Sequence, residues 1–86
     1  MTNAFQTAVS RTVPHRQRLT AIDRLADADE HVALQTIVLT GGLDGRYRRR
    51  ALDRLADCGA REALETLAND GTIERTLRRR ARRRLQ

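Results

Sequence analysis

The side chains that could form a nucleophile and base pair in this chain are few. Ser10 and Cys58 are the candidate nucleophiles, and His15 and His31 are the two histidines. A nucleophile of this kind needs its base within hydrogen-bond reach. Ser10 and His15 lie on opposite sides of Pro14, and Cys58 falls in a turn with no histidine at helical spacing. The pattern predicts no catalytic pair, and we expect a protein that is not an enzyme.

Motifs for metals and phosphates are equally weak. Two histidines and one cysteine, without CxxC or HxxxH spacing, predict no zinc site. One local cluster combines acids with a histidine: Asp27, Asp29, Glu30 and His31. We interpret it as an N-cap and a complement to a helix dipole, with a weak cation site as the alternative. The glycines at 41, 42 and 45 lack the GK[ST] of a phosphate loop, so we predict no cofactor.

The elements that position these side chains follow from a repeat of 30 residues. Residues 21–27, AIDRLAD, return as residues 51–57, ALDRLAD, and eleven of the 25 positions in 17–41 are identical in 47–71. A third copy starts with LRRRA at residue 77, against YRRRA at residue 47, and is cut off by the C-terminus. Such self-similarity is the signature of stacked structural repeats.

Each copy is predicted to contain two helices. The apolar residues from Tyr47 to Leu55 lie on one arc of a helical wheel, and Gly59 separates this helix from a second, shorter one. Pro14 fits the first turn of a helix, and Asp29 is the expected N-cap of the next. We therefore expect an opening helix before Pro14 and further helices over residues 14–26, 30–40, 44–56, 60–69 and 72–85.

Composition agrees with this architecture. Hydrophobic residues make up 40% of the chain and aromatic residues 2%, and the abundant alanine and leucine favour helices over strands. Eighty-six residues form one small domain with a thin core, which a partner or a second copy would enlarge. We predict a single all-α domain over residues 1–86.

The sequence also bears on the compartment. Cys58 has no partner for an intramolecular disulfide, the N-terminus lacks the charged and apolar regions of a signal peptide, and no apolar run reaches membrane-spanning length. We expect a cytoplasmic protein that does not act at a membrane.

Two runs with the same spacing carry a resemblance to a known family: Tyr47-Arg48-x-x-Ala51-x-x-x-Leu55 and Leu77-Arg78-x-x-Ala81-x-x-x-Leu85, with Ala63 and Leu67 in the helix between. They resemble HEAT-like repeats of the short phycobilisome-lyase type over most of residues 13–86. The first copy departs from the pattern, with Gln17 at the aliphatic position. The resemblance implies three helical hairpins, at approximately 3–26, 30–56 and 60–85. They would form a short right-handed α–α superhelix whose motif-carrying helices line the concave face.

Charge is unevenly distributed along the chain. All 17 basic residues are arginine, and against 11 acids they leave a net charge of +6. Residues 1–43 hold four arginines and four acids, whereas residues 44–86 hold thirteen arginines and seven acids. A GC-rich coding bias explains the missing lysine but not the position of the excess, which indicates an anionic partner or a solvated charged end.

The arginines divide into two groups. Arg18, Arg48 and Arg78 recur at the repeat period within the apolar arc, so we expect them to bind neighbouring helix ends or Asp27 and Asp57. A second group faces outward with few acids nearby, and stacking its helices would build one basic stripe. The predicted partner-binding residues are Arg46, Arg49, Arg50, Arg75, Arg79, Arg80 and Arg83.

Arg82 interrupts the repeat, because the same register holds Ile22 and Leu52 in the earlier copies. A last repeat needs a polar outer face, so we interpret Arg82 as part of a cap and expect the chain to be complete.

These features predict a non-enzymatic interaction module. The leading hypothesis is an adaptor or assembly subunit that binds an acidic protein through a concave, arginine-rich face. The alternative is sequence-nonspecific binding of nucleic acid through the phosphate backbone, since Phe5 and Tyr47, the only aromatic residues, lie on apolar faces. A homodimer is a third hypothesis.

Overall fold

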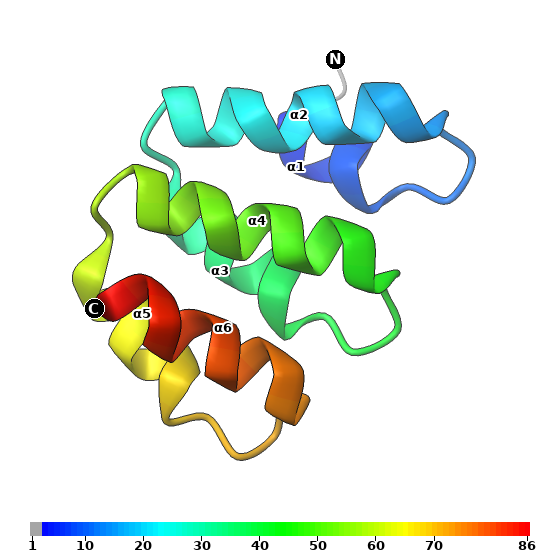
Figure 1. Cartoon of the computed structure of the whole chain (residues 1–86). Coiled ribbons are helices and arrows are strands. Elements are labelled where there is room, and N and C mark those ends of the chain that lie inside the picture. Colours follow the sequence, from blue (N-terminus) through cyan, green and yellow to red (C-terminus); the bar gives the residue numbers. More distant parts are fainter. Residues whose placement is uncertain (1–2) are drawn as a thin grey trace.

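The computed structural model describes residues 3–86, which form six helices and contain no strand. The helices are α1 (Ala4–Val9), α2 (His15–Asp27), α3 (His31–Leu39), α4 (Gly45–Asp57), α5 (Arg61–Ala68) and α6 (Arg75–Leu85) (Figure 1). The predicted all-α fold class is confirmed.

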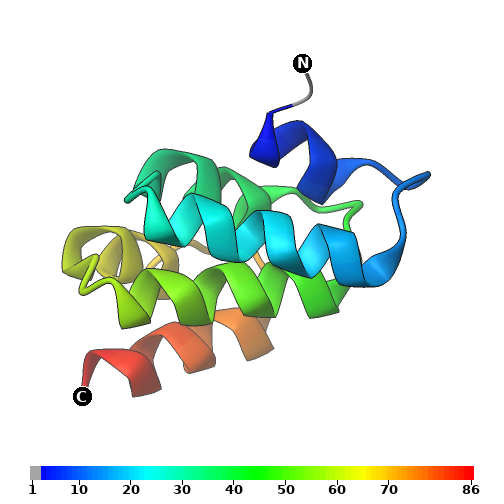
Figure 2. The same ribbon diagram turned by 90° about the horizontal axis from the view of Figure 1, so that it is seen from above.

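Successive helices pair into three hairpins, α1 with α2, α3 with α4, and α5 with α6. The hairpins stack side by side, so that α2, α4 and α6 form one layer and α1, α3 and α5 form the other (Figures 1 and 2). The longer helices α2, α4 and α6 each carry one copy of the repeated motif. Equivalent residues of successive copies therefore lie on adjacent helices.

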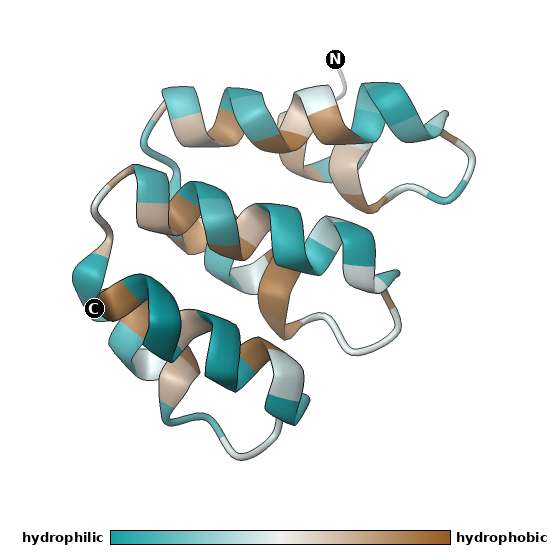
Figure 3. Ribbon diagram, viewed as in Figure 1, coloured by the Kyte–Doolittle hydropathy of each residue, from teal (hydrophilic) through white to brown (hydrophobic). Residues whose placement is uncertain are grey.

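The core lies between the two layers, where brown apolar segments face one another in Figure 3. Its largest side chains with no exposed surface include Ile22 of α2, Leu34 and Ile37 of α3, and Leu52 and Leu55 of α4. Ile22 and Leu52 share one register of the repeat. The repeat therefore places an apolar side chain in the core at the same position of each of the first two hairpins.

Each turn that joins one hairpin to the next contains a residue with left-handed backbone conformation. Asp29 has φ of 56° and Gly59 has φ of 70°, and the following amides, of Glu30 and Ala60, donate to carbonyls in the last turn of the preceding helix at 2.9 and 3.0 Å. This is the Schellman arrangement that ends a helix. The predicted N-cap role of Asp29 is therefore wrong, because the repeat register places it at the residue after the C-cap of α2.

All five predicted starts of α2 to α6 lie too early, the first four by one residue and that of α6 by three. Pro14 is the N-cap of α2, and the helix begins one residue later. Helix α6 begins at Arg75 and not at Thr72, because the Asp70 carboxylate accepts hydrogen bonds from the Thr72 amide and hydroxyl and holds that segment in a turn. Ile73, which was predicted to lie on this helix, belongs to the turn, and its side chain is buried there.

The two carboxylates that organise turns predict sensitivity to acid. The Arg46 side chain, hydrogen bonded to Asp44, lowers the pKa of that carboxyl, and the hydrogen bond from the Thr72 side chain lowers the pKa of Asp70. A folded-state pKa below the unfolded value of about 4 stabilises the fold above pH 4, and this contribution disappears as pH falls through the folded pKa.

We expect the melting temperature to fall between pH 5 and pH 2, and the double variant Asp44→Asn/Asp70→Asn to show a shallower fall. Thermal unfolding followed by circular dichroism at each pH measures this. Equal acid sensitivity in the variant and the parent would contradict the assignment.

Two buried arginines each join the two helices of their own hairpin. Arg18 is 7% exposed and its Nε donates to the Ala8 carbonyl at 2.9 Å, while Arg48 is 3% exposed and its Nε donates to the Val38 carbonyl at 2.8 Å. The Arg18 guanidinium also lies 3.8 Å from the centre of the Tyr47 ring in the next hairpin. These contacts confirm the predicted binding of helix ends.

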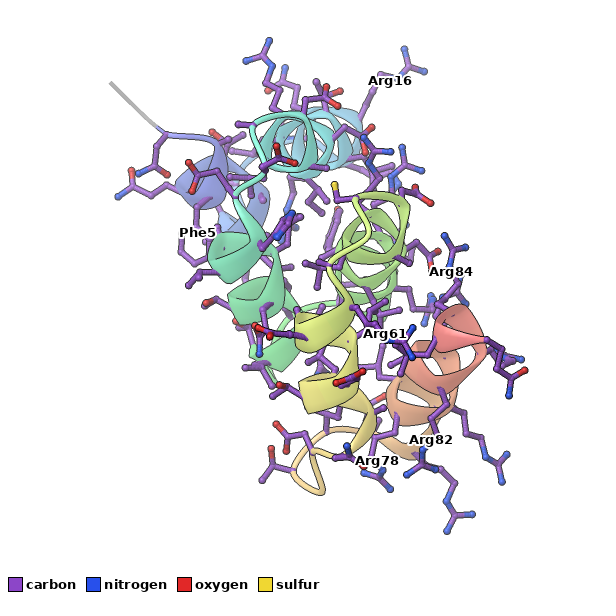
Figure 4. The ribbon with its side chains drawn as sticks, turned by 90° about the vertical axis from the view of Figure 1, so that its left-hand side faces the viewer. Phe5, Arg16, Arg61, Arg78, Arg82 and Arg84 are labelled. Atoms are coloured by element: carbon purple, nitrogen blue, oxygen red, sulfur yellow. The ribbon has the colours of Figure 1, made fainter. Side chains whose placement is uncertain are left out.

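The third copy uses a different arginine for the equivalent carbonyl. Arg78 donates to the carbonyls of Asp70 and Ile73, whereas Arg82 donates to the Ala68 carbonyl at 3.1 Å. Ala68 is equivalent to Ala8 and Val38 at the 30-residue register. Both arginines lie beside the last hairpin in Figure 4, where Arg82 gives it a polar outer side.

Candidate anion-binding surface

The seven predicted binding arginines all lie on α4 and α6, in the layer that also contains α2. Teal segments cover the outward side of these helices in Figure 3. In Figure 4, Arg16 of α2 and Arg84 of α6 belong to this layer, and Phe5 lies in the opposite one. Arginine is thus concentrated on the helices that carry the repeated motif.

Acidic residues of the preceding repeat neutralise part of this surface. Arg50 donates from Nε and Nη2 to the Asp23 carboxylate at 3.0 and 2.7 Å. Arg80 donates to Asp53 in the same way, at 2.7 and 2.6 Å. The hydrogen bond to Asp53 raises the pKa of Arg80, and the one to Asp23 raises the pKa of Arg50. The expectation that few acids lie near these arginines is therefore wrong at Arg50 and Arg80.

A second set of ion pairs runs beside the first. Arg54 Nη2 lies 3.2 Å from Asp27, and Arg84 Nη2 lies 2.6 Å from Asp57. All four pairs join residues 27 apart in sequence, so together they form an inter-repeat ladder, consisting of Asp23–Arg50, Asp27–Arg54, Asp53–Arg80 and Asp57–Arg84. Asp27 and Asp57 thus pair with these outward arginines, and the predicted pairing with Arg18, Arg48 and Arg78 is wrong.

The ladder makes a modest contribution to stability because its members are partly exposed. The Arg80 and Asp53 side chains retain 35% and 25% of their exposure, and exposed pairs contribute only about 0.2–1 kcal/mol. Its main effect is on charge. The carboxylates of the ladder offset the repulsion between arginines on neighbouring helices.

Four of the seven predicted residues form no ion pair with the described residues 3–86: Arg49, Arg75, Arg79 and Arg83. All four are exposed. The other three are Arg50 and Arg80 of the ladder and Arg46, which lies 3.1 Å from Asp44. The surface available to an anion is therefore smaller than predicted.

Gly45 accommodates one of these cations. A Cβ atom at Gly45 would lie 2.8 Å from Arg49 Nη1, so the guanidinium lies across the first residue of α4. Beside it a shallow cavity of about 270 Å³ spans the three helices of the layer. Its lining comprises His15, Leu19, Arg46, Arg49, Arg50, Asp53 and Arg80. The cavity combines a partly apolar wall from Leu19 with a cationic border.

The structure gives Ser10 and His15 hydrogen-bond partners other than each other. The Ser10 hydroxyl lies 3.0 Å from the Thr12 hydroxyl, and His15 Nδ1 lies 2.8 Å from the Tyr47 hydroxyl. Burial raises the pKa of the Cys58 thiol, which keeps it protonated near neutral pH and weakens it as a nucleophile.

The fold brings together three residues that the sequence pattern did not connect. Potential ligand atoms of Asp29, His31 and Cys58 lie within 4.8 Å of one another. The signal in the sequence was a local departure from the repeat. The registers of Asp29 and His31 hold Gly59 and an arginine in the second copy, and Cys58 replaces an alanine of the first.

Comparison of the chain with protein-family models, with curated proteins and with solved structures finds no match. Among the helices of residues 3–86, the search for membrane spans finds none of sufficient length and apolar character.

Proposed function

We propose that this protein is a non-enzymatic interaction module built from HEAT-like helical hairpins, and that it binds an acidic segment of another protein on the layer of α2, α4 and α6. The HEAT-like part of the proposal rests on the repeated motif and on the stacked helical hairpins that carry it. The observation that carries the function is the set of arginines left unpaired by the ladder on α4 and α6.

Register places two of these cations on neighbouring helices. Arg49 and Arg79 are 30 residues apart, and packed helices lie about 10 Å from one another. Arg83 adds a third cation one turn after Arg79. Guanidinium groups present a planar pair of donors that matches a carboxylate, so a row of them favours an extended acidic chain.

Leu19 favours a protein partner over a simple polyanion. It occupies the register of Arg49 and lines the cavity beside it. A peptide that alternates acidic and apolar residues can place an apolar side chain against Leu19 and its carboxylates against the arginines. Apolar contact also makes binding less sensitive to salt than charge pairing alone.

Nucleic acid is the second candidate, supported by the row on α6. Arg75, Arg79 and Arg83 follow one another at intervals of four residues, about 6 Å along the helix. Such a row suits phosphates, and binding of this kind weakens steeply with salt.

The ends of the layer argue against an end-to-end homodimer. Arg16 and Arg24 of α2 and Arg83 of α6 form no ion pair within the part of the chain that the structure describes. Stacking two copies end to end would bring these arginines together without the acids of the ladder, so a second copy is not part of the proposal.

Charge removal at matched positions tests the proposal. We expect Arg49→Gln/Arg79→Gln/Arg83→Gln to weaken binding of a labelled Glu/Leu-alternating peptide on the order of tenfold or more, since each exposed pair contributes up to about 1 kcal/mol. Fluorescence anisotropy at several salt concentrations measures the affinity. The control Arg11→Gln/Arg61→Gln removes charge from the α1–α2 loop and from α5, outside this layer, and should bind nearly as the parent does.

Leu19→Gln distinguishes the two candidates, with circular dichroism confirming that the variant folds. Loss of peptide binding in this variant supports the protein partner. Nucleic acid is supported if Leu19→Gln leaves the affinity for duplex DNA unchanged. In that case the log–log salt slope of DNA binding should also become shallower by about 3 in the Arg49→Gln/Arg79→Gln/Arg83→Gln variant. No binding of either probe at low salt would refute both.

A further inference from the structure

The two turns that join successive hairpins bring an oxygen, a nitrogen and a sulfur donor together. Asp29 and His31 lie at the turn from α2 to α3, and Cys58 follows α4 at the turn to α5. His31 Nε2 and Asp29 Oδ1 are 3.7 Å apart, and the ligand atoms of all three residues lie within 4.8 Å of one another. Two turns separated by one repeat therefore meet at a single point.

The nitrogen in this group has no hydrogen-bond partner. The His31 side chain is 38% exposed, but its Nε2 atom is shielded from solvent, and no atom of residues 3–86 satisfies it. The 3.7 Å to Asp29 exceeds the length of a hydrogen bond. Buried polar atoms in folded proteins are almost always satisfied, and an unsatisfied one calls for an explanation such as an ion.

Asp29 occupies a conformation that the second copy gives to glycine. Its φ of 56° corresponds to the φ of 70° at Gly59. Glycine adopts this region without steric penalty, whereas a residue with a Cβ atom does not. The carboxylate is thus present at a turn where the backbone alone favours glycine.

Solvent and ions can reach the site. A groove of about 500 Å³ between α3 and α5 includes His31, Gly59 and Glu62 in its lining. The groove leaves room for a water molecule beside His31.

We propose that Asp29, His31 and Cys58 bind a divalent transition-metal ion of the zinc class, with a water molecule as the fourth ligand. Zinc takes cysteine sulfur at about 2.3 Å and histidine nitrogen or carboxylate oxygen at about 2.0–2.2 Å, which separates neighbouring ligand atoms by about 3.5 Å. The observed separations approach this value, so small side-chain movements complete the site. The ion would tie the α2–α3 turn to the α4–α5 turn.

Cobalt reports directly on this site because a thiolate ligand adds an intense charge-transfer band to its visible spectrum. We expect tag-free, reduced protein to develop this band on titration with Co²⁺ and to lose it when Zn²⁺ is added. Zn²⁺ at 100 times its Kd should raise the melting temperature by on the order of 10 °C.

Residues from the other copies supply variants that suit the fold. Cys58→Ala, Asp29→Gly and His31→Arg each introduce the residue found at the same register elsewhere in the chain. We expect each to lower Zn²⁺ affinity on the order of 100-fold, and Cys58→Ala to abolish the charge-transfer band. Asp29→Gly should melt no lower than the parent without metal, because it relieves the left-handed aspartate.

His15→Gln is the matched control, because it removes the other histidine and should leave both the band and the thermal shift unchanged. The proposal is overturned if no sulfur-to-cobalt band forms in the parent. It is equally overturned if the band survives in Cys58→Ala, or if Zn²⁺ affinity is unchanged in His31→Arg.

Discussion

Replacing Arg48 by methionine is expected to lower the free energy of unfolding by about 2–3 kcal/mol. Arg48 is 3% exposed, and its Nε donates to the carbonyl of Val38, a residue with no exposed surface, near the end of α3. Methionine fills much of the same volume but leaves this carbonyl without a donor. For a domain whose total stability is about 4–13 kcal/mol, the loss is large.

The neighbouring residue supplies the control. Arg49→Met removes the same charge from an exposed position and should change the free energy of unfolding by no more than about 0.5 kcal/mol. Arg48→Lys should recover only part of the loss, because an ammonium cannot reproduce the fork that also reaches Glu74 at 3.2 Å. Urea unfolding with unchanged m values measures all three variants. Equal stability of Arg48→Met and Arg49→Met would contradict a structural role for Arg48.

Exchanging residues at one register of the repeat should destabilise the fold much more in the second copy than in the third. Leu52 has no exposed surface, so Leu52→Arg places a charge in the core and should cost more than about 4 kcal/mol. Arg82 has the same register but is exposed, and Arg82→Leu should stay within about 1 kcal/mol, with the lost hydrogen bond to the Ala68 carbonyl as its main cost.

Because Leu52→Arg is expected to lose cooperative unfolding altogether, Leu52→Ala provides a measurable companion. Removal of a fully buried leucine costs about 2.7–5 kcal/mol, depending on how far the cavity collapses. Thermal and urea unfolding report both changes. A Leu52→Ala variant as stable as the parent, or an unfolded Arg82→Leu variant, would show that position in the stack does not decide the role of this register.

Local patterns were sufficient to predict the helices. The apolar arc from Tyr47 to Leu55 and the glycine at Gly59 predicted α4 and its end to within one residue, because helical periodicity and left-handed caps act over a few neighbouring residues. The start of α6 was predicted three residues early. There, the hydrogen bonds from Thr72 to Asp70 compete with helix formation, and periodicity does not detect such turns.

The candidate surface was only partly predictable. Sequence register correctly places Arg49 and Arg79 on neighbouring helices, but it did not reveal that Arg80 binds Asp53. That contact depends on how far one helix is shifted along the next, which sets the 27-residue spacing of the ladder in place of the 30-residue spacing of the repeat. The shift results from side-chain packing between helices, and no local sequence signal encodes it.

The sequence by itself thus determined an all-α chain of repeated helical pairs and the excess of arginine in its second half, since these depend on composition and short-range periodicity. The tertiary structure alone decided which arginines are neutralised and which form no ion pair with residues 3–86. It also decided that Cys58 lies beside Asp29 and His31, although 27 residues separate the cysteine from the histidine. Both outcomes depend on the stacking of one repeat on the next, because that stacking brings side chains about 30 residues apart into contact.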